Sequence, residues 1–416
     1  MQHATELGEW IGAEFIRPGH PTDAIDGRVP QLVVVPGSAE EVAAVMRYAT
    51  AHGLCVAARG GGTKCGWGNT PHALDLVLSL ARLNRVTEHA WGDMTASAEA
   101  GCAIGALQAT LAAHGQRLAL DAHWPAQATI GGMLATGDSG ALRLRYGGLR
   151  DLLIGITVVL PDGTIARSGG KVVKNVAGYD LPKLMTGALG TLGVIVAATF
   201  RLHPLPRTER TFSIATGDAA HAAAVMLAAL DSALVPGAMQ VRCDGSGAWL
   251  DFCFEGVEAA IDEQIGLLAT LTGARVAQPA DAAVWQAREA LWAGDDPALV
   301  CKVAVLPSQA AQLDQLLRHV AGQLQLKWRL VLQAIGVGML RLEGANHEVL
   351  LTALSTLRDE LLRWGGSLVA LGCPAAIKSR IDVWGAVGDD MALMRRVKAQ
   401  FDPLGILNPG RFVGGI

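Results

Sequence analysis

The residues that most clearly suggest chemistry are the run R-G-G-G-T-K at residues 59–64. Three consecutive glycines leave backbone N–H groups unshielded, and glycine reaches the positive φ values that a loop needs to wrap closely around a phosphate. Arg59 and Lys64 flank the loop with positive charge. The run therefore predicts a cradle for a pyrophosphate, with a glycine-rich surface turn that binds nothing as the alternative.

Two common nucleotide motifs do not fit this loop. A Walker A loop requires Ser or Thr after its lysine, but Cys65 follows Lys64. A Rossmann fingerprint requires a helix directly after its glycines. Here residues 66–71, G-W-G-N-T-P, predict more loop, and the apolar runs at 54–58 and 73–80 predict strands on either side. The motif is therefore a strand–loop–strand cradle.

Two further glycine-rich segments follow in the chain. Residues 128–137, A-T-I-G-G-M-L-A-T-G, are small and apolar. A helix that starts here would offer free N–H groups to an anion, and a flat cofactor could lie against its backbone. Tight packing between helices is the alternative. Residues 187–193, G-A-L-G-T-L-G, lead into an apolar strand at 194–202.

The first half of the chain must position these segments. Residues 32–35 predict a strand, and Ser38 with Glu41 forms a capping box for a helix that Gly53 ends. With the strand at 54–58 this makes a compact β-α-β unit. Further strands are expected at 95–100, 152–160 and 164–167, the last two joined by a P-D-G turn, and a helix at 104–114.

The second half is less rich in glycine and more regular. Helices are expected at 219–230, 257–271, 308–324, 347–364 and 391–400, and strands at 247–253, 300–305, 329–333, 337–342 and 367–371. This alternation predicts an α+β sandwich of the ferredoxin-like kind, and no sequence repeat is evident. Pro204 and Pro206 mark a boundary, so we expect an N-terminal extension (1–25), a first domain (26–205) and a second domain (206–416).

Composition narrows the class of protein. The net charge of −4 and the lack of a long basic run argue against nucleic acid as a partner. The N-terminus lacks the basic start and apolar core of a signal peptide, and the longest uncharged runs, 100–116 and 184–200, fall short of a membrane span. We therefore expect a cytoplasmic protein. The seven scattered cysteines without a C-x-x-C pair argue against disulfide, zinc and iron–sulfur frameworks.

The three glycine segments, in this order, resemble the FAD-binding fold of the vanillyl-alcohol oxidase superfamily, also called PCMH-type. The runs K-N-V-A-G-Y-D-L at 174–181 and F-D-P-L-G-I-L-N-P-G-R at 401–411 are similar to the FAD-binding E subunits of bacterial glycolate oxidases, as are residues 285–292 and 365–374. The resemblance implies an α+β protein, with a two-subdomain PCMH-type FAD-binding domain followed by a ferredoxin-like FAD-linked oxidase C-terminal domain.

The resemblance also implies FAD as the cofactor. Its pyrophosphate is expected against the first glycine loop, its flavin along the T-I-G-G segment, and backbone contacts from the third segment. The implied cofactor residues are Arg59, Gly60, Gly61, Gly62, Thr63, Lys64, Pro125, Thr129, Ile130, Gly131, Gly132, Ala135, Gly137, Gly190, Gly193, Val194 and Ile195. Many relatives tether the flavin through a His just after the glycines, and since Thr63 stands there we expect non-covalent FAD.

The catalytic residues stay unknown. Relatives that oxidise 2-hydroxy acids carry two metal-binding histidines and an E-H-G motif in the second domain, and His203, His221, His319 and His347 form no such pattern. We therefore expect no metal. Candidates to face an anionic substrate, each with a surface or partner contact as its alternative role, are Arg329, Arg341, Lys378 and Arg380.

The resemblance implies a subunit that works beside a second FAD-linked subunit and an iron–sulfur subunit. Such a complex oxidises glycolate to glyoxylate and passes electrons to an acceptor other than oxygen, in the cytoplasm or at the inner membrane through a partner. One alternative is a stand-alone FAD-dependent 2-hydroxy-acid dehydrogenase, for which His123 is the nominated base. The other is a non-catalytic subunit that holds FAD for assembly.

Overall fold

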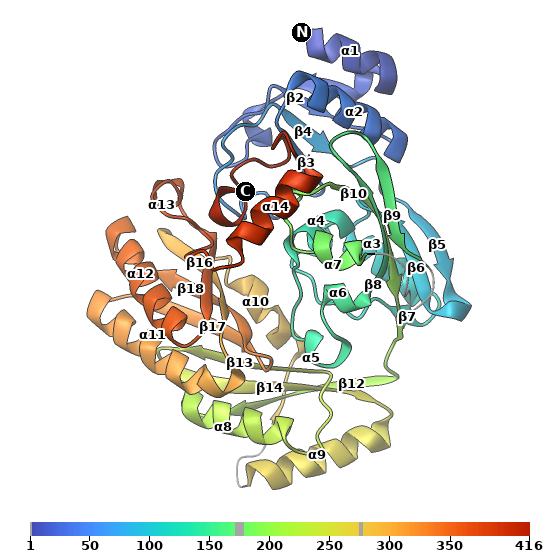
Figure 1. Ribbon diagram of the computed structural model, residues 1–416. Helices are drawn as coiled ribbons and strands as arrows, with labels where there is room; N and C mark the ends of the chain where they lie inside the picture. The colour runs from blue at the N-terminus through green and yellow to red at the C-terminus, as the bar shows by residue number, and fades with distance from the viewer. Residues whose placement is uncertain (1, 171–178, 274–277) are drawn as a thin grey trace. The chain divides into compact units, whose positions relative to one another are not determined.

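The computed structural model describes residues 2–170, 179–273 and 278–416, and the chain forms two compact units (Figure 1). Unit 1 consists of Met1–Ser139, Gly148–Leu205 and Ala386–Ile416, and unit 2 consists of Gly140–Gly147 and Pro206–Gly385. The chain passes from unit 1 into the larger part of unit 2 between Leu205 and Pro206, at the expected boundary. Most of the motif at 174–181 lies outside the described residues.

The first glycine loop belongs to a four-stranded sheet of unit 1 with the order β1-β2-β4-β3. Its strands are β1 (Ile16–Pro18), β2 (Leu32–Val34), β3 (Val56–Arg59) and β4 (Leu76–Ser79). Strands β2, β4 and β3 are parallel, and helix α2 (Ala39–His52) joins β2 to β3. Ser38 and Gly53 cap α2 as expected, because the Ser38 hydroxyl accepts from the Glu41 N–H and Gly53 takes the left-handed conformation. The expected capping box is incomplete, because the Glu41 carboxylate accepts from the N–H of Gly37 instead of Ser38.

The other two glycine segments lie beside an antiparallel sheet with the order β5-β6-β10-β8-β9. Its strands are β5 (Val86–Ala90), β6 (Thr95–Glu99), β8 (Leu153–Val159), β9 (Ile165–Gly169) and β10 (Val194–Arg201), and a two-stranded sheet joins β7 (Gln116–Arg117) to β11 (His203–Pro204). The shorter helices of unit 1 are α3 (Ile104–Ala112), α4 (Ile130–Thr136), α6 (Leu149–Leu152) and α7 (Leu181–Met185).

Both ends of the chain pack into unit 1. The expected extension instead forms helix α1 (Gln2–Ile11), which packs on α2, and strand β1, which pairs with β2. At the other end, helix α14 (Met391–Phe401) and the tail behind it lie in unit 1 because Leu407 forms a β-bridge with Val56. The domain expected at 206–416 is therefore divided, and only its part up to Gly385 forms unit 2.

Unit 2 is an eight-stranded antiparallel sheet with the order β15-β12-β14-β13-β17-β18-β16-β19. Its strands are β12 (Thr208–Ala215), β13 (Ala238–Asp244), β14 (Gly247–Gly256), β15 (Gln278–Pro279), β16 (Ala298–Ala304), β17 (Lys327–Gln333), β18 (Val337–Glu343) and β19 (Ser367–Gly372). Its helices are α5 (Arg143–Tyr146), α8 (Ala219–Leu230), α9 (Glu258–Thr272), α10 (Ala287–Ala290), α11 (Ala310–Leu324), α12 (His347–Arg363) and α13 (Ala375–Lys378).

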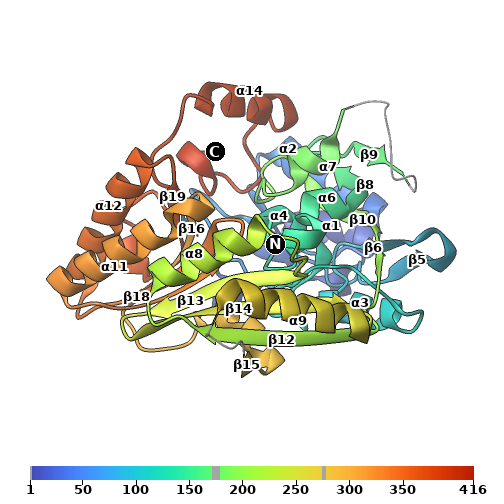
Figure 2. The same cartoon turned by 90° about the horizontal axis from the view of Figure 1, so that it is seen from below.

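The sheet of unit 2 contains two ferredoxin-like halves. Each half runs β-α-β-β-α-β along the chain, from β12 to β15 and from β16 to β19, and β13 pairs with β17 to join them. Helices α8, α9, α11 and α12 cover one face of the sheet (Figures 1 and 2). The predicted fold class is confirmed, and the structure adds a duplication that no sequence repeat reveals.

Candidate cofactor site

The three glycine segments meet around one hollow in unit 1, which we call the glycine hollow. Its empty volume is about 740 Å³, a figure that includes space open to solvent. The lining residues are Ala58, Arg59, Gly60, Gly61, Gly62, Thr63, Lys64, Cys65, Leu80, Ala100, Thr129, Gly131, Gly132, Ala135, Thr136, Leu189, Gly190, Gly193, Ile195, Asn408 and Arg411.

All but four of the predicted cofactor residues line the glycine hollow. Ile130 and Val194 instead point into the hydrophobic core. Gly137 ends helix α4 in the left-handed conformation, and the carbonyl of Pro125 accepts a hydrogen bond from Gly105. If Ile130, Val194 and Gly137 contact FAD, they must do so through backbone atoms. Contact with FAD stays a prediction for every residue of the predicted set.

The first two glycines of the loop are required by close packing rather than by conformation. A Cβ atom on Gly60 would lie 2.0 Å from the Thr129 hydroxyl oxygen, and one on Gly61 would lie 1.8 Å from the carbonyl oxygen of Gln127. Gly62 has a φ of +77°, which side chains disfavour. The loop at 59–64 and the T-I-G-G segment are therefore one fitted surface.

The start of helix α4 does not offer the free N–H groups that the sequence predicted. Thr129 caps the helix by accepting from the Gly132 N–H. The N–H groups of Ile130 and Gly131 donate to the carbonyls of Cys102 and Ala100. The expected free N–H groups are therefore not found at this helix start, because the Thr129 hydroxyl and the turn that follows β6 accept from them.

Both cations that flank the first loop are paired with carboxylates. Arg59 lies 2.9 Å from Asp23, and Lys64 lies 3.4 Å from Asp138 with only 4% of its side chain exposed. The guanidinium groups of Arg17 and Arg59 hold the pKa of Asp23 well below its usual range. Both side chains are therefore engaged by carboxylates, whereas the backbone of the glycine loop offers further donors for a phosphate.

Lys64 lies in a buried polar cluster with two aromatic rings. Its ammonium lies 5.7 Å from the ring centre of Trp67 and 5.6 Å from that of Trp124. The Nδ1 atom of His123 lies 3.0 Å from Asp138, which also accepts from the His123 N–H. Asp138 thus connects the first glycine loop to the segment that precedes Pro125.

The sequence analysis missed Asn408 and Arg411 as residues of the site. Both line the glycine hollow, and each is only 4% exposed. The tail at 401–411 carries these two polar residues among turn-forming residues, which could have marked them as candidates. The sequence around them does not indicate which part of the fold they contact. Cys65 also lines the hollow, and burial raises the pKa of its thiol, which therefore stays neutral.

Three of the four residues nominated for an anionic substrate make polar contacts within unit 2. Arg341 is buried, pairs with Glu343 and donates to the carbonyls of Leu291 and Asp295. Arg329 donates to the carbonyl of Ala293, and exposed Arg380 pairs with Glu348. Lys378 is buried. Arg341 and Lys378 are therefore not surface charges, and Arg341 serves the fold.

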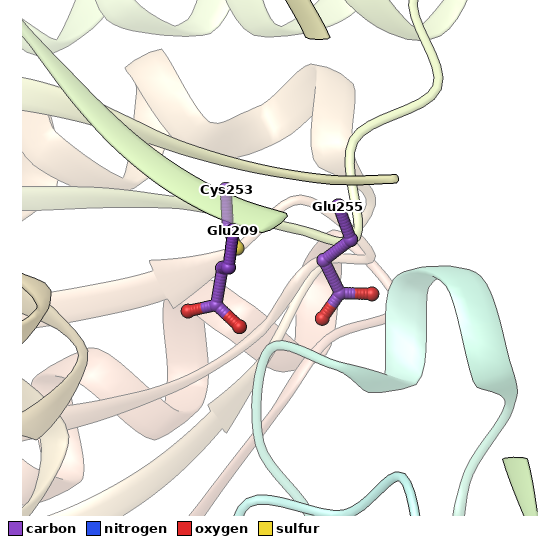
Figure 3. A group of neighbouring side chains, drawn as sticks. All are labelled: Glu209, Cys253 and Glu255. Carbon is purple, nitrogen blue, oxygen red and sulfur yellow. The ribbon is translucent and has the colours of Figure 1, made fainter. Parts of the chain in front are cut away.

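One group in the described residues has a composition that could hold a cation. Glu209, Cys253 and Glu255 bring their ligand atoms within 4.8 Å of one another on β12 and β14 (Figure 3). Glu255 also accepts a hydrogen bond from the Tyr146 hydroxyl of α5. Because grouped acidic side chains are common without a bound ion, the group is no argument for a metal, and the expectation of no metal stays a prediction.

Comparison with protein families identifies two matching regions. Residues 30–169 match the FAD binding domain family, and residues 386–412 match the C-terminal domain of FAD linked oxidases. The first region contains the first two glycine segments, and the second contains Asn408 and Arg411. The two regions of unit 1 that enclose much of the glycine hollow are therefore those that the family models recognise.

Curated relatives match somewhat less than half of the chain. The glycolate oxidase subunit GlcD of Bacillus subtilis is 33% identical over 183 residues, 44% of this chain and 39% of that protein. The D-lactate dehydrogenase of Archaeoglobus fulgidus is 37% identical over 184 residues, 44% of this chain and 41% of that protein. The D-2-hydroxyglutarate dehydrogenase of Xanthomonas citri pv. viticola is 36% identical over 186 residues, 45% of this chain and 39% of that protein. The matches thus span about two-fifths of each relative.

Solved structures share the fold across the whole chain. p-Cresol methylhydroxylase with substrate bound has a TM-score of 0.79 at 16% identity, covering 99% of this chain and 96% of that chain. 4-Ethylphenol oxidase from Gulosibacter chungangensis has a TM-score of 0.76 at 17% identity, with the same coverage.

The described residues fit FAD, because the glycine loop, kept free of side chains by its packing on residues 127–129, can accept a pyrophosphate against its backbone. With the fold and both family matches in agreement, residues 30–169 correspond to an FAD binding domain and residues 386–412 to part of the C-terminal domain of FAD linked oxidases, within a PCMH-type fold, and FAD is the cofactor that this domain binds.

Proposed function

We propose that this chain is the FAD-binding subunit of a complex that oxidises glycolate, a 2-hydroxy acid, to glyoxylate. The observation that carries the proposal is the shared FAD domain, since the relatives named above act on glycolate, D-lactate and D-2-hydroxyglutarate by their names. The tail at 401–411, similar to that of E subunits, favours glycolate among these acids.

Two partners are part of this proposal, a second FAD-linked subunit and an iron–sulfur subunit. In the described part of the chain, the one group of three or more metal-ligating side chains contains no histidine. That group contains a single cysteine, so the described residues offer no group of this size that resembles the cysteine set of an iron–sulfur cluster. We therefore assign substrate binding and onward electron transfer in large part to the partners, which would place the complex in the cytoplasm or against the inner membrane.

The chemistry of the reaction belongs to FAD, which accepts two electrons from the carbon that bears the hydroxyl group. This chain's residues bind and orient it. The backbone of residues 60–63 would hold the pyrophosphate, and Thr129 and Ala135 would lie along the remainder of the cofactor. The described helices include none long and apolar enough to cross a membrane.

The test compares substrates on the reconstituted complex. We expect the highest kcat/KM with glycolate, and markedly lower values with D-lactate and D-2-hydroxyglutarate. We also expect glycolate to bleach the flavin of this chain only when the partners are present. A higher kcat/KM for either longer acid would contradict the glycolate assignment, and activity of the chain without partners would contradict the division of labour.

A stand-alone 2-hydroxy-acid dehydrogenase is a second candidate because of the His123–Asp138 pair. A carboxylate that holds Nδ1 of a histidine is the arrangement of a positioned general base. His123 is 1% exposed, however, and does not line the glycine hollow. This candidate predicts that His123→Gln abolishes reduction of the flavin by 2-hydroxy acids in the isolated chain, whereas an isolated chain that no such acid reduces would exclude it.

A further inference from the structure

The C-terminal tail connects the loop residues that directly follow the first glycine segment to the third glycine segment. Arg411 donates through Nη2 to the carbonyl oxygens of Cys65 and Trp67, at 2.5 and 2.6 Å. Asn408 donates through Nδ2 to the carbonyl of Leu189 at 2.7 Å. Arg411 also donates to the Asn408 side chain at 3.2 Å. One chain of hydrogen bonds thus runs from the residues that follow the first glycine segment to the third segment.

The backbone of the tail is held to strand β3 and to the loop that follows it. The N–H of Asn408 donates to the carbonyl of Val56, and the N–H of Val56 donates to Ile406. On the far side of the loop, the N–H of Asn69 donates to the carbonyl of Arg411. Asn408 has a φ of 45°, a left-handed conformation that asparagine tolerates better than most residues. Its side chain and its backbone both therefore require asparagine.

A buried ion pair fixes the tail at its other end. Lys398 on α14 lies 2.6 Å from Asp402 and donates to the carbonyls of Thr191 and Leu407. The Asp402 carboxylate accepts from the N–H groups of Ile406 and Leu407. Because Asp402 is 2% exposed, breaking this pair leaves buried charge without compensation. The tail consequently has one defined docked position.

We propose that residues 402–411 are a clasp that completes the FAD site, with Arg411 and Asn408 as positioning residues for the two loops. The loop N–H groups can serve a pyrophosphate only if the loop is held in one conformation, and Arg411 fixes the loop through the carbonyls of Cys65 and Trp67, which follow the glycines. Docking of the clasp and binding of FAD then favour each other. By linkage, FAD must hold the clasp in place as strongly as the clasp holds FAD.

A buried arginine in unit 2 is a matched control. Arg358 donates to the carbonyls of Leu368, Asp382 and Val383, at 3.0, 2.9 and 2.6 Å. Burial lowers the pKa of both Arg358 and Arg411. The two arginines thus do similar structural work, but only Arg411 touches the loops of the glycine hollow. Replacing Arg358 measures the cost of losing a buried arginine without an effect on the loops.

The test measures FAD affinity and thermal stability together. We expect Arg411→Met and Asn408→Ala to raise the dissociation constant of FAD about tenfold or more, as loss of a buried polar contact does. They should also reduce the gain in Tm on adding FAD. Arg358→Met should lower Tm equally with and without FAD and leave the dissociation constant unchanged. An Arg411→Met protein with lower Tm but unchanged FAD affinity would overturn the proposal.

A second measurement on the unaltered chain covers the case in which Arg411→Met does not fold. Carboxypeptidase should trim the tail past Arg411 more slowly when FAD is bound, with the slowing rising in step with FAD occupancy. Arg411→Lys, which keeps a donor and the charge, should show an intermediate protection. Equal trimming rates with and without FAD, in a folded chain, would refute the coupling.

Discussion

At the scale of single residues, the site depends on three glycines, and the physical reason that each must be glycine differs. Gly60 and Gly61 face neighbouring atoms at distances that exclude any side chain, whereas Gly62 is needed for its positive φ. The sequence showed three equivalent glycines and allowed the prediction of a cradle. The sequence could not show that the first two glycines are required by close packing against residues 127–129, because that contact is formed only in the folded protein.

Gly61→Ala should abolish FAD binding. Its Cβ would lie 1.8 Å from the backbone carbonyl oxygen of Gln127, which cannot rotate away. Gly66→Ala is the control on the same loop, since a Cβ there meets no atom within 4 Å. Flavin fluorescence titration of both folded variants checks this prediction, and FAD affinity in Gly61→Ala equal to that in Gly66→Ala would refute it.

Lys64 illustrates what a local pattern cannot reveal. Its position at the end of the loop favoured a phosphate contact, but its side chain turns into the core towards Asp138 and two tryptophans. Asp138 lies 74 positions further along the chain. The positive charge of Lys64 could be read from the sequence. The direction of its side chain could not, because it depends on Asp138, which only the fold brings close.

Asp23 should make the stability of unit 1 sensitive to acid. Hydrogen bonds from Arg17 lower its pKa in the folded state, so its contribution is complete above the unfolded pKa of about 3.9 and is lost as pH falls towards the folded value. Asp23→Asn should cost about 1 kcal/mol in the free energy of unfolding at pH 7. Urea unfolding at pH 7 and pH 2.5 checks this, and a cost that grows towards pH 2.5 would contradict it.

At the scale of elements, long amphipathic helices were predictable and polar strands were not. Helices α8, α9, α11, α12 and α14 lie within a few residues of their predicted ranges. Strands β12 and β13 were missed, because T-E-R-T-F-S-I-A and A-M-Q-V-R-C-D place charged residues among the apolar ones. Their pairing with β14 and β17, rather than their own pattern, makes them strands.

Thr129 should matter both for helix α4 and for the site. Thr129→Val removes the oxygen that accepts from the Gly132 N–H, and loss of such a cap costs about 1 kcal/mol. We expect lower stability and weaker FAD binding, since the same side chain packs over Gly60. Thr129→Ser keeps the oxygen and is the control. Thermal melts and FAD titration measure the effects, and equal values for the two variants would argue against the role of the cap.

At the scale of the whole molecule, the FAD domain was recognisable from its motifs, but its extent was not. The order of three glycine segments indicated the fold of unit 1, and the fold class is confirmed. The return of residues 386–416 to unit 1 could not be predicted, because the bridge from Val56 to Leu407 spans most of the chain. The duplication in unit 2 could not be seen in the sequence. The buried face of a sheet requires apolar residues but not particular ones, so the two halves can share a fold without sharing a sequence pattern.

The most direct test of the central claim is the visible spectrum of the purified, folded chain before and after denaturation. The account predicts a flavin spectrum and release of all the FAD into solution on denaturation, as expected for a cofactor held by the loop backbone with Thr63 beside it. A folded chain that contains no flavin, and takes up none when incubated with excess FAD, would contradict it.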